Sequence, residues 1–174
     1  MIHFQKSLIM LFVGNYKDWI KPEWIEFLLT NDGTKRPSGG ENPDCEEFRM
    51  ATSVGYDMTK TYWHHYTGAK FPFEIAPPFA TDKKYMWWFI KMTPGQFMPM
   101  HRDPHITQDG FTNCTRYWVA LQDYDPGHIF IQGTQVLVNY KAGDVWSYDD
   151  ANEIHGACNI GFTTRLTAHF TTYD

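Results

Sequence analysis

The most constraining feature of this 174-residue chain is the even spacing of turn signals through its second half. These signals are Pro94-Gly95, Asp109-Gly110, Asp125-Pro126-Gly127, Gly133, Ala142-Gly143 and Asn159-Ile160-Gly161. Such residues supply the backbone conformations that tight turns need. The segments between them predict eight short strands: Tyr85–Met92, Gln96–Arg102, Thr115–Gln122, His128–Ile131, Thr134–Asn139, Asp144–Tyr148, Ile154–Cys158 and Thr163–Thr172. Eight short strands with regular turns indicate a sandwich or barrel, and we expect a mainly β jelly-roll barrel over residues 85–174.

Residues 1–84 have a mixed pattern, which predicts N-terminal helices packed on one sheet of the barrel. The apolar segment Leu8–Val13 is expected to be a buried strand, because it lacks the flanks of a signal peptide. Lys21–Leu29 predicts a helix with a proline near its first turn. Asn31–Asp44 has the composition of a turn-rich loop, and Thr59–Tyr66 is expected to form a further helix. We interpret the whole chain as one domain, since its length suits a single core.

His101, Asp103 and His155 have the residue types of a metal site with two histidines and one carboxylate. Side chains at positions i and i+2 of a strand point to the same face, so His101 and Asp103 can bind one ion from one segment, while His155 must come from another strand. This donor set holds non-haem Fe(II) on one face and leaves the other coordination positions open. We therefore predict that these three residues are the metal ligands and the catalytic centre. The alternative for His101 and Asp103 is a hydrogen bond between the two side chains on a surface strand.

Arg165 follows the second histidine and is the next candidate. A guanidinium group is always charged and matches a carboxylate in a bidentate geometry. An iron site with an arginine nearby indicates an oxygenase that uses an anionic co-substrate. The alternative is a surface arginine on a terminal strand.

Composition restricts the partners and the compartment. The net charge is −5 without a Lys/Arg cluster, so no nucleic-acid partner is expected. Cys45, Cys114 and Cys158 form no CxxC pair, which argues against a disulfide framework and favours a reducing, cytoplasmic setting. No apolar run reaches the length of a membrane span, so no membrane partner is expected. A small-molecule or peptide substrate remains, and the oligomeric state is left open.

Four motifs extend the metal residues: Thr93-Pro94-Gly95-x5-His101-x-Asp103, Thr112-Asn113-Cys114-Thr115-Arg116, Gly143-Asp144-Val145-x-x-Tyr148-Asp149-Asp150-x4-His155 and Thr164-Arg165-Leu166. Together they resemble the Fe(II)/2-oxoglutarate-dependent oxygenases, most closely the aspartyl/asparaginyl β-hydroxylase branch. The resemblance covers roughly residues 90–174 and implies a double-stranded β-helix (cupin-like) core. It implies an enzyme, a dioxygenase that uses Fe(II), O2 and 2-oxoglutarate to hydroxylate an amino-acid side chain, free or in a peptide.

Carried over to this chain, the resemblance implies that Arg165 binds the distal carboxylate of 2-oxoglutarate and that Arg116 is a second basic residue on the co-substrate. Trp118 stands where that branch tends to have a histidine, and we place it with the cofactor-binding residues. Asp103 is a second departure, since that branch often has glycine there.

Alternatives remain at several residues. Arg116 can instead pair with Asp123 or Asp125, and core packing is the alternative for Trp118 and Tyr148. His64 and His65 are expected near the surface, and His169 is expected to be a satisfied core histidine. The rival functions are a cupin-type metalloprotein that does not use 2-oxoglutarate and a non-catalytic barrel that binds a ligand.

Overall fold

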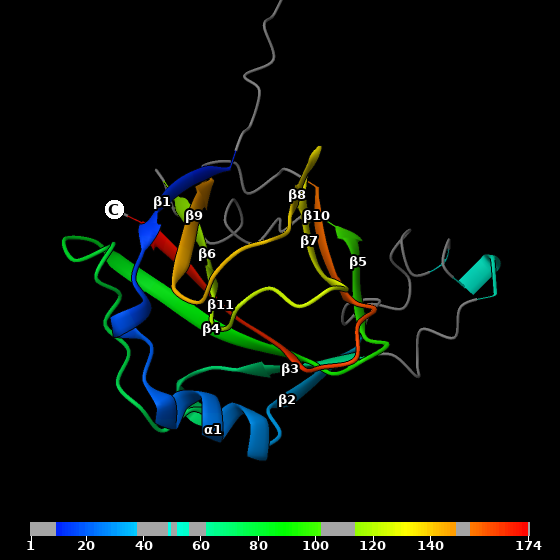
Figure 1. Ribbon diagram of the computed structural model, residues 1–174, viewed down its shortest axis with the longest axis horizontal. Helices are drawn as coiled ribbons and strands as arrows, with labels where there is room; N and C mark the ends of the chain where they lie inside the picture. The colour runs from blue at the N-terminus through cyan, green and yellow to red at the C-terminus, as the bar shows by residue number, and fades with distance from the viewer. Residues whose placement is uncertain are drawn as a thin grey trace, which may run out of the picture.

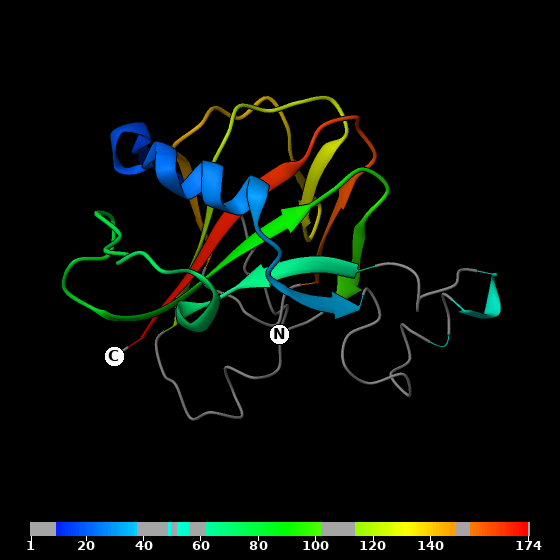
Figure 2. The ribbon, with the colours of Figure 1, turned by 90° about the horizontal axis from the view of Figure 1, so that it is seen from below.

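The computed structural model describes residues 10–37, 49, 52–55, 62–101, 114–148 and 154–173 (Figures 1 and 2). Its elements are β1 (Leu11–Asn15), η1 (Lys17–Trp19), α1 (Pro22–Thr30), β2 (Thr34–Pro37), β3 (Tyr62–Tyr66), η2 (Gly68–Lys70), β4 (Lys84–Met92), β5 (Phe97–His101), β6 (Thr115–Ala120), β7 (His128–Gln132), β8 (Gln135–Leu137), β9 (Asp144–Tyr148), β10 (His155–Asn159) and β11 (Arg165–Tyr173). Among these residues, no helix is both long and apolar enough to cross a membrane.

Strands β4 to β11 form a double-stranded β-helix. The large sheet has the order β1-β9-β6-β11-β4-β3-β2 and the small sheet has the order β5-β10-β7-β8. The first of the eight strands pairs with the last, the second with the seventh, and so on inward to the β7–β8 hairpin. This nested antiparallel pairing is a long hairpin wound into a barrel, and its turn lies at Gly133, whose φ of 56° falls in the left-handed region that glycine tolerates.

The eight strands expected after residue 84 are all present, with shifts of a few residues at their ends. The mainly β fold with a cupin-like barrel is therefore confirmed. The interpretation of the chain as one domain stays a prediction.

The N-terminal half differs from expectation in two places. Thr59–Tyr66 is not a helix where the structure describes it, because β3 occupies Tyr62–Tyr66 and pairs with β4. The expected loop Asn31–Asp44 contains β2, which pairs with β3. β3 extends the large sheet at the edge of β4 and β2 extends it further at the edge of β3, so sheet pairing outweighs a local pattern too short to define a period.

The expected buried strand Leu8–Val13 is exposed over Leu11–Val13, while Met10 is buried and residues 8 and 9 lie outside the described residues. β1 pairs with β9 only, at the edge of the large sheet. Leu11 and Phe12 are 60% and 58% exposed, because the small sheet does not cover them. A strand of apolar residues can therefore lie at a sheet edge, and hydrophobicity alone did not locate it.

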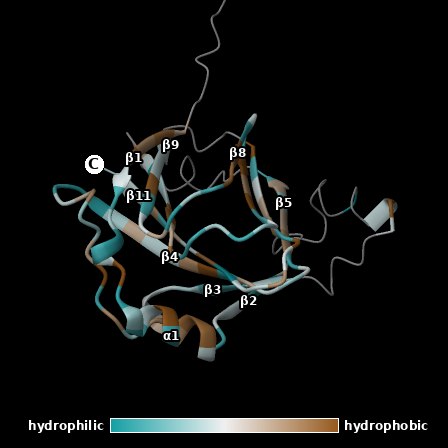
Figure 3. Ribbon diagram, in the orientation of Figure 1, coloured by the Kyte–Doolittle hydropathy of each residue, from teal (hydrophilic) through white to brown (hydrophobic). Residues whose placement is uncertain are grey.

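Helix α1 covers the outer face of the large sheet (Figures 1 and 2). Pro22 begins the helix, where its missing N–H is not needed. Trp24 and Leu28 are one turn apart and are buried against Phe89 and Phe170 in an aromatic-rich cluster. Hydrophobic residues line α1 and the neighbouring part of β4 (Figure 3). The expectation of a helix packed on one sheet is confirmed.

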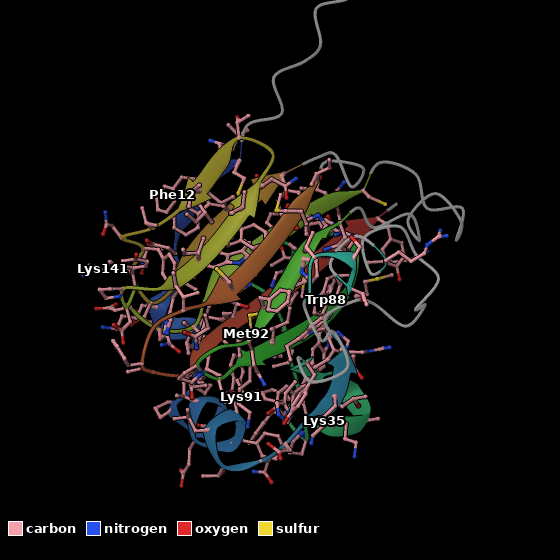
Figure 4. All side chains as sticks on the ribbon, turned by 90° about the vertical axis from the view of Figure 1, so that its right-hand side faces the viewer. Phe12, Lys35, Trp88, Lys91, Met92 and Lys141 are labelled. Carbon is pink, nitrogen blue, oxygen red and sulfur yellow. The ribbon has the colours of Figure 1, made fainter. Side chains whose placement is uncertain are left out.

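Lys91 and Tyr66 tie the end of α1 to the sheet. The ammonium of Lys91 donates to the carbonyl oxygen of Asn31 at 2.5 Å and to Asp32 at 3.2 Å. The hydroxyl of Tyr66 donates to the same carbonyl at 2.7 Å. Lys91 therefore points toward α1, away from the barrel interior (Figure 4).

Two histidines on β3 are more buried than expected. His64 is only 4% exposed, and His65 packs at 6.3 Å from the Trp88 ring. Burial, together with the nearby positive charge of Arg36, lowers the pKa of His65 from 6.5 to about 4. Burial also lowers the pKa of His64. These histidines are neutral in the folded protein at pH values where the unfolded chain would protonate.

We expect the free energy of unfolding to decrease as the pH falls from 6.5 toward 4. In that window the unfolded chain binds a proton at His65 that the folded protein does not bind. The full effect for this residue is on the order of 3 kcal/mol. Urea unfolding at several pH values should show the decrease, and His65→Gln should make it shallower. An identical pH profile in the variant would contradict the assignment.

Candidate active site

The interior of the barrel is polar along β11. Its inward side chains are Arg165, Thr167, His169 and Thr171, all of them buried. Its outward side chains are apolar and join the cluster under α1: Leu166, Ala168 and Phe170. A barrel packed only for stability would fill this face with apolar side chains. The alternation along β11 therefore places four polar side chains inside the barrel.

The structure brings His101 and His155 together. They are direct partners across β5 and β10, and their ring centroids are 4.3 Å apart. His101 Nδ1 lies 2.8 Å from the carbonyl oxygen of Pro99. A proton on that nitrogen would donate to the carbonyl and leave Nε2 as the metal-binding atom, which is how metal-ligating histidines are usually oriented.

Asp103, the third predicted ligand, lies outside the described residues, as do Asp149 and Asp150. Within the part of the chain that is described, no group of three His, Cys, Asp or Glu side chains can hold a metal. The two histidines supply two imidazole donors, which suits Fe(II) and other transition metals. A third ligand therefore remains a prediction for Asp103.

Arg165 is inside the barrel and not on the surface. Its side chain is 1% exposed, and Nη1 donates to the sulfur of Met92 at 3.5 Å. Nε and Nη2 have no hydrogen-bond partner among the described residues. Burial lowers the pKa of this guanidinium, although an arginine still keeps its proton. Met92 marks the end of β4 beside it (Figure 4).

Trp118 and Tyr140 lie beside this guanidinium, and each carries a further hydrogen-bond donor. The guanidinium carbon lies 5.9 Å from the Trp118 ring centre, and the rings of Trp118 and Tyr140 are 5.0 Å apart. The indole N–H and the Tyr140 hydroxyl are both buried without a hydrogen-bond partner within the described residues. Burial raises the pKa of Tyr140, while the charge of Arg165 and the contact of its guanidinium with the hydroxyl oppose that shift, so the hydroxyl keeps its proton. We call Arg165, Trp118 and Tyr140 the donor cluster.

The donor cluster and the histidine pair face the same interior space. The ring centroid of Phe130 on β7 lies 5.6 Å from that of Trp118 and 6.3 Å from that of His155. His169 stands beside it at 6.0 Å and stacks on Trp88. One molecule with a carboxylate at the cluster can therefore reach toward the two histidines.

Arg116 is buried as well, at 2% exposure. Its guanidinium carbon lies 5.9 Å from the centre of the Trp88 ring. Arg116 pairs with Thr171 near the C-terminal end of β11, whereas Arg165 begins that strand. Asp123 and Asp125, the alternative partners of Arg116, have other contacts among the described residues. Asp123 pairs with Lys141 at 3.6 Å, and Asp125 accepts a hydrogen bond from Thr163.

Sequence reasoning missed Tyr140 and Gln132. Tyr140 lies between β8 and β9, outside any strand, and nothing in its local sequence indicates an inward side chain. Gln132 alternates with Phe130 along β7, so its inward direction was predictable, but its unpaired amide oxygen was not.

Asn159 holds the connection that presents Arg165. Its side-chain N–H groups donate to the carbonyl oxygens of Met92 and Thr163, each at 2.8 Å. Its oxygen accepts from Gly161 at 3.1 Å, and the side chain is fully buried. This residue therefore joins the end of β10 to β4 and to the loop before β11.

We expect Asn159→Ala to lower the free energy of unfolding by about 2–4 kcal/mol, because it leaves buried carbonyl groups unpaired. Asn15 is a matched control, since it makes three similar hydrogen bonds at an exposed site. Asn15→Ala should cost less than about 1 kcal/mol. Chemical unfolding of both variants measures the difference, and equal losses would show that the Asn159 bonds carry no special weight.

A surface hollow of about 510 Å³ lies beside η1, lined by Asn15, Tyr16, Lys17, Asp18, Trp19 and Pro78. It contains none of the predicted site residues and lies outside the barrel interior.

Comparison with known proteins gives similarity in fold only. No family model and no curated protein matches the chain. Among solved structures, a predicted oxalate decarboxylase from Thermotoga maritima is 16% identical with a TM-score of 0.42, covering 66% of this chain and 84% of that one. The Cnp3 cupin domain of Schizosaccharomyces pombe is 12% identical with a TM-score of 0.42, covering 70% and 74%. A cupin superfamily protein from Desulfitobacterium hafniense is 13% identical with a TM-score of 0.39, covering 64% and 78%. Similarity at this level does not transfer an activity, and the assignment of the fold rests on the strand order above.

Proposed function

We propose that this protein is an Fe(II)/2-oxoglutarate-dependent dioxygenase that hydroxylates an amino-acid side chain, free or in a peptide. The observation that carries the proposal is the buried guanidinium of Arg165, whose Nε and Nη2 have no hydrogen-bond partner among the described residues. An uncompensated charge inside a protein costs several kcal/mol. A ligand that brings a carboxylate removes this cost and explains why the arginine is there.

A carboxylate suits the donor cluster in shape and in polarity. It accepts two parallel hydrogen bonds from one guanidinium. Two further donors, the Trp118 indole and the Tyr140 hydroxyl, lie beside the guanidinium, and no acidic residue competes among the described neighbours. The cluster would bind the distal carboxylate of 2-oxoglutarate, whose other end would extend toward His101 and His155.

The histidine pair would supply two of the iron ligands, with Asp103 as the proposed third. Iron bound there would supply the O2 activation that couples decarboxylation of 2-oxoglutarate to hydroxylation of an unactivated C–H bond. The protein's own contribution is positioning: Arg165 fixes the co-substrate, and the aromatic walls of Trp118 and Phe130 exclude water.

Anaerobic titration with Fe(II) and 2-oxoglutarate tests the proposal. The protein should develop a weak visible metal-to-ligand charge-transfer band, and with O2 and ascorbate it should slowly form succinate without any substrate. A cupin-type metalloprotein would bind the metal without the band. A non-catalytic binding barrel would bind no metal. Absence of both the band and succinate in metal-loaded protein would reject the proposal.

A further inference from the structure

Gln132 lies next to the histidine pair on the inner face of the small sheet. It ends β7 and is the direct partner of His155, which is in turn the partner of His101. Directly opposed residues of an antiparallel pair project to the same face, with Cβ atoms about 5 Å apart. The amide of Gln132 therefore borders the proposed metal position from the side opposite to His101.

The carbonyl oxygen of this amide has no partner within the described residues. The side chain is 1% exposed, and Oε1 is buried without a hydrogen bond. Gln135, on the next strand in the same row, shows the ordinary case, since its oxygen accepts from the backbone N–H of Met10 at 2.5 Å. A buried acceptor without a donor destabilises the folded protein, so stability alone does not explain Gln132.

The unsatisfied groups of the interior differ in kind. The donor cluster offers N–H and O–H groups to an anion, whereas Gln132 offers an acceptor beside the histidines. A carboxylate cannot satisfy the carbonyl oxygen of Gln132, because a carboxylate oxygen and an amide oxygen are both acceptors without a proton to donate at neutral pH. The interior therefore offers unsatisfied groups of opposite polarity at the donor cluster and beside the histidine pair.

We infer that Gln132 selects a substrate that presents an N–H group, an amine or an amide, next to the carbon that reacts. The inference deepens the proposed function and rests on it. Gln132 is in this view a specificity-determining residue, and the N–H class includes both free amino acids and peptide amides.

The experiment compares Gln132→Leu, Gln132→Glu and the matched control Gln135→Leu. The probes are the standard L-amino acids, their N-acetyl amides and the corresponding deaminated carboxylic acids, which carry hydrogen in place of the α-amine and therefore have no N–H or O–H donor at that carbon. Two quantities are measured for each protein: the melting-temperature shift caused by each compound, and succinate formation above the substrate-free background.

We expect some amine or amide compounds to raise the melting temperature of the wild-type protein, while their deaminated analogues do not. Gln132→Leu should bind those compounds about tenfold more weakly or worse, since one hydrogen bond to a buried acceptor is lost. Gln132→Glu keeps an acceptor and should retain binding of the amines. Without ligand, Gln132→Leu should melt no lower than wild type, whereas Gln135→Leu should melt lower.

Three results would overturn the inference: no N–H compound binds, Gln132→Leu binds like wild type, or it loses as much stability as Gln135→Leu. Its failure is separable from that of the proposed function. Succinate formation with binding that ignores Gln132 would leave the oxygenase and remove the inference. Gln132-dependent binding without succinate would support Gln132 as a binding residue and would reject the oxygenase.

Discussion

Replacing Arg165 with methionine is expected to stabilise the ligand-free protein and to abolish tight binding of 2-oxoglutarate. Arg165 is fully buried, and its Nη1 donates to a methionine sulfur. An apolar side chain of similar length removes the desolvation cost, and replacing buried charge in this way often stabilises by about 1–4 kcal/mol. The same change removes a bidentate partner of the carboxylate, which should weaken binding by about 2–4 kcal/mol, or roughly 30- to 1000-fold.

Two measurements check this pair of effects. Urea unfolding gives the stability of the ligand-free protein, and calorimetry under anaerobic conditions gives the affinity for 2-oxoglutarate. Lys141→Met is the control, because Lys141 is an exposed cation already paired with Asp123. It should change stability by less than about 1 kcal/mol and leave co-substrate binding unaltered. Unchanged 2-oxoglutarate affinity in Arg165→Met would reject the anion site, and a large loss of stability would show a structural role instead.

Removal of either histidine of the pair is expected to eliminate metal-dependent turnover. His101→Ala and His155→Ala should each weaken metal binding by more than about 100-fold, because loss of a ligand exceeds the effect of losing an orienting partner. Succinate formation should vanish in both variants. Asp103→Gly is the informative third variant, since it should lose much of the metal affinity if Asp103 completes the site, and it can retain a trace of activity.

Metal titration of the ligand-free variants provides the readout, with His128→Gln as the control. His128 is also a buried histidine, but its ring lies 3.0 Å from the carbonyl oxygen of Thr163, near the far end of β10. Burial lowers the pKa of His128, so its ring is neutral at pH 7. Because His128 is not one of the proposed metal ligands, its replacement controls for the loss of a buried histidine. Equal metal affinity in His155→Ala and His128→Gln would falsify the assignment of the pair.

Much of the fold was readable from turn chemistry. The spacing of Gly, Pro, Asn and Asp residues predicted all eight strands of the barrel, because each turn needs backbone conformations that few residues adopt. The pair of histidines could also be predicted from the sequence, because two imidazoles on separate strands of one barrel are typical of a metal site. The strand β3 was not readable, because a five-residue aromatic segment fits either period until a neighbouring strand offers its hydrogen bonds.

The burial of Arg165 depended on the tertiary structure. On β11, polar and apolar residues alternate, which is equally consistent with a surface strand that shows its polar side to water. Helix α1 covers the apolar face, and the small sheet covers the polar face, so the arginine lies inside. The sequence of β11 determines that polar and apolar residues alternate. Which of its two faces lies inside the barrel is decided by the packing of α1 on one face and of the small sheet on the other.

The unpaired groups were beyond any reading of the chain. Tyr140 and Gln132 have ordinary local contexts, and each becomes informative only because its polar atom is buried with no partner among the described residues. Local chemistry determines the strands, the turns and the types of donor. Whether a donor is satisfied depends on every neighbour that the nested pairing brings within hydrogen-bond distance, and that distance is a property of the packed barrel alone.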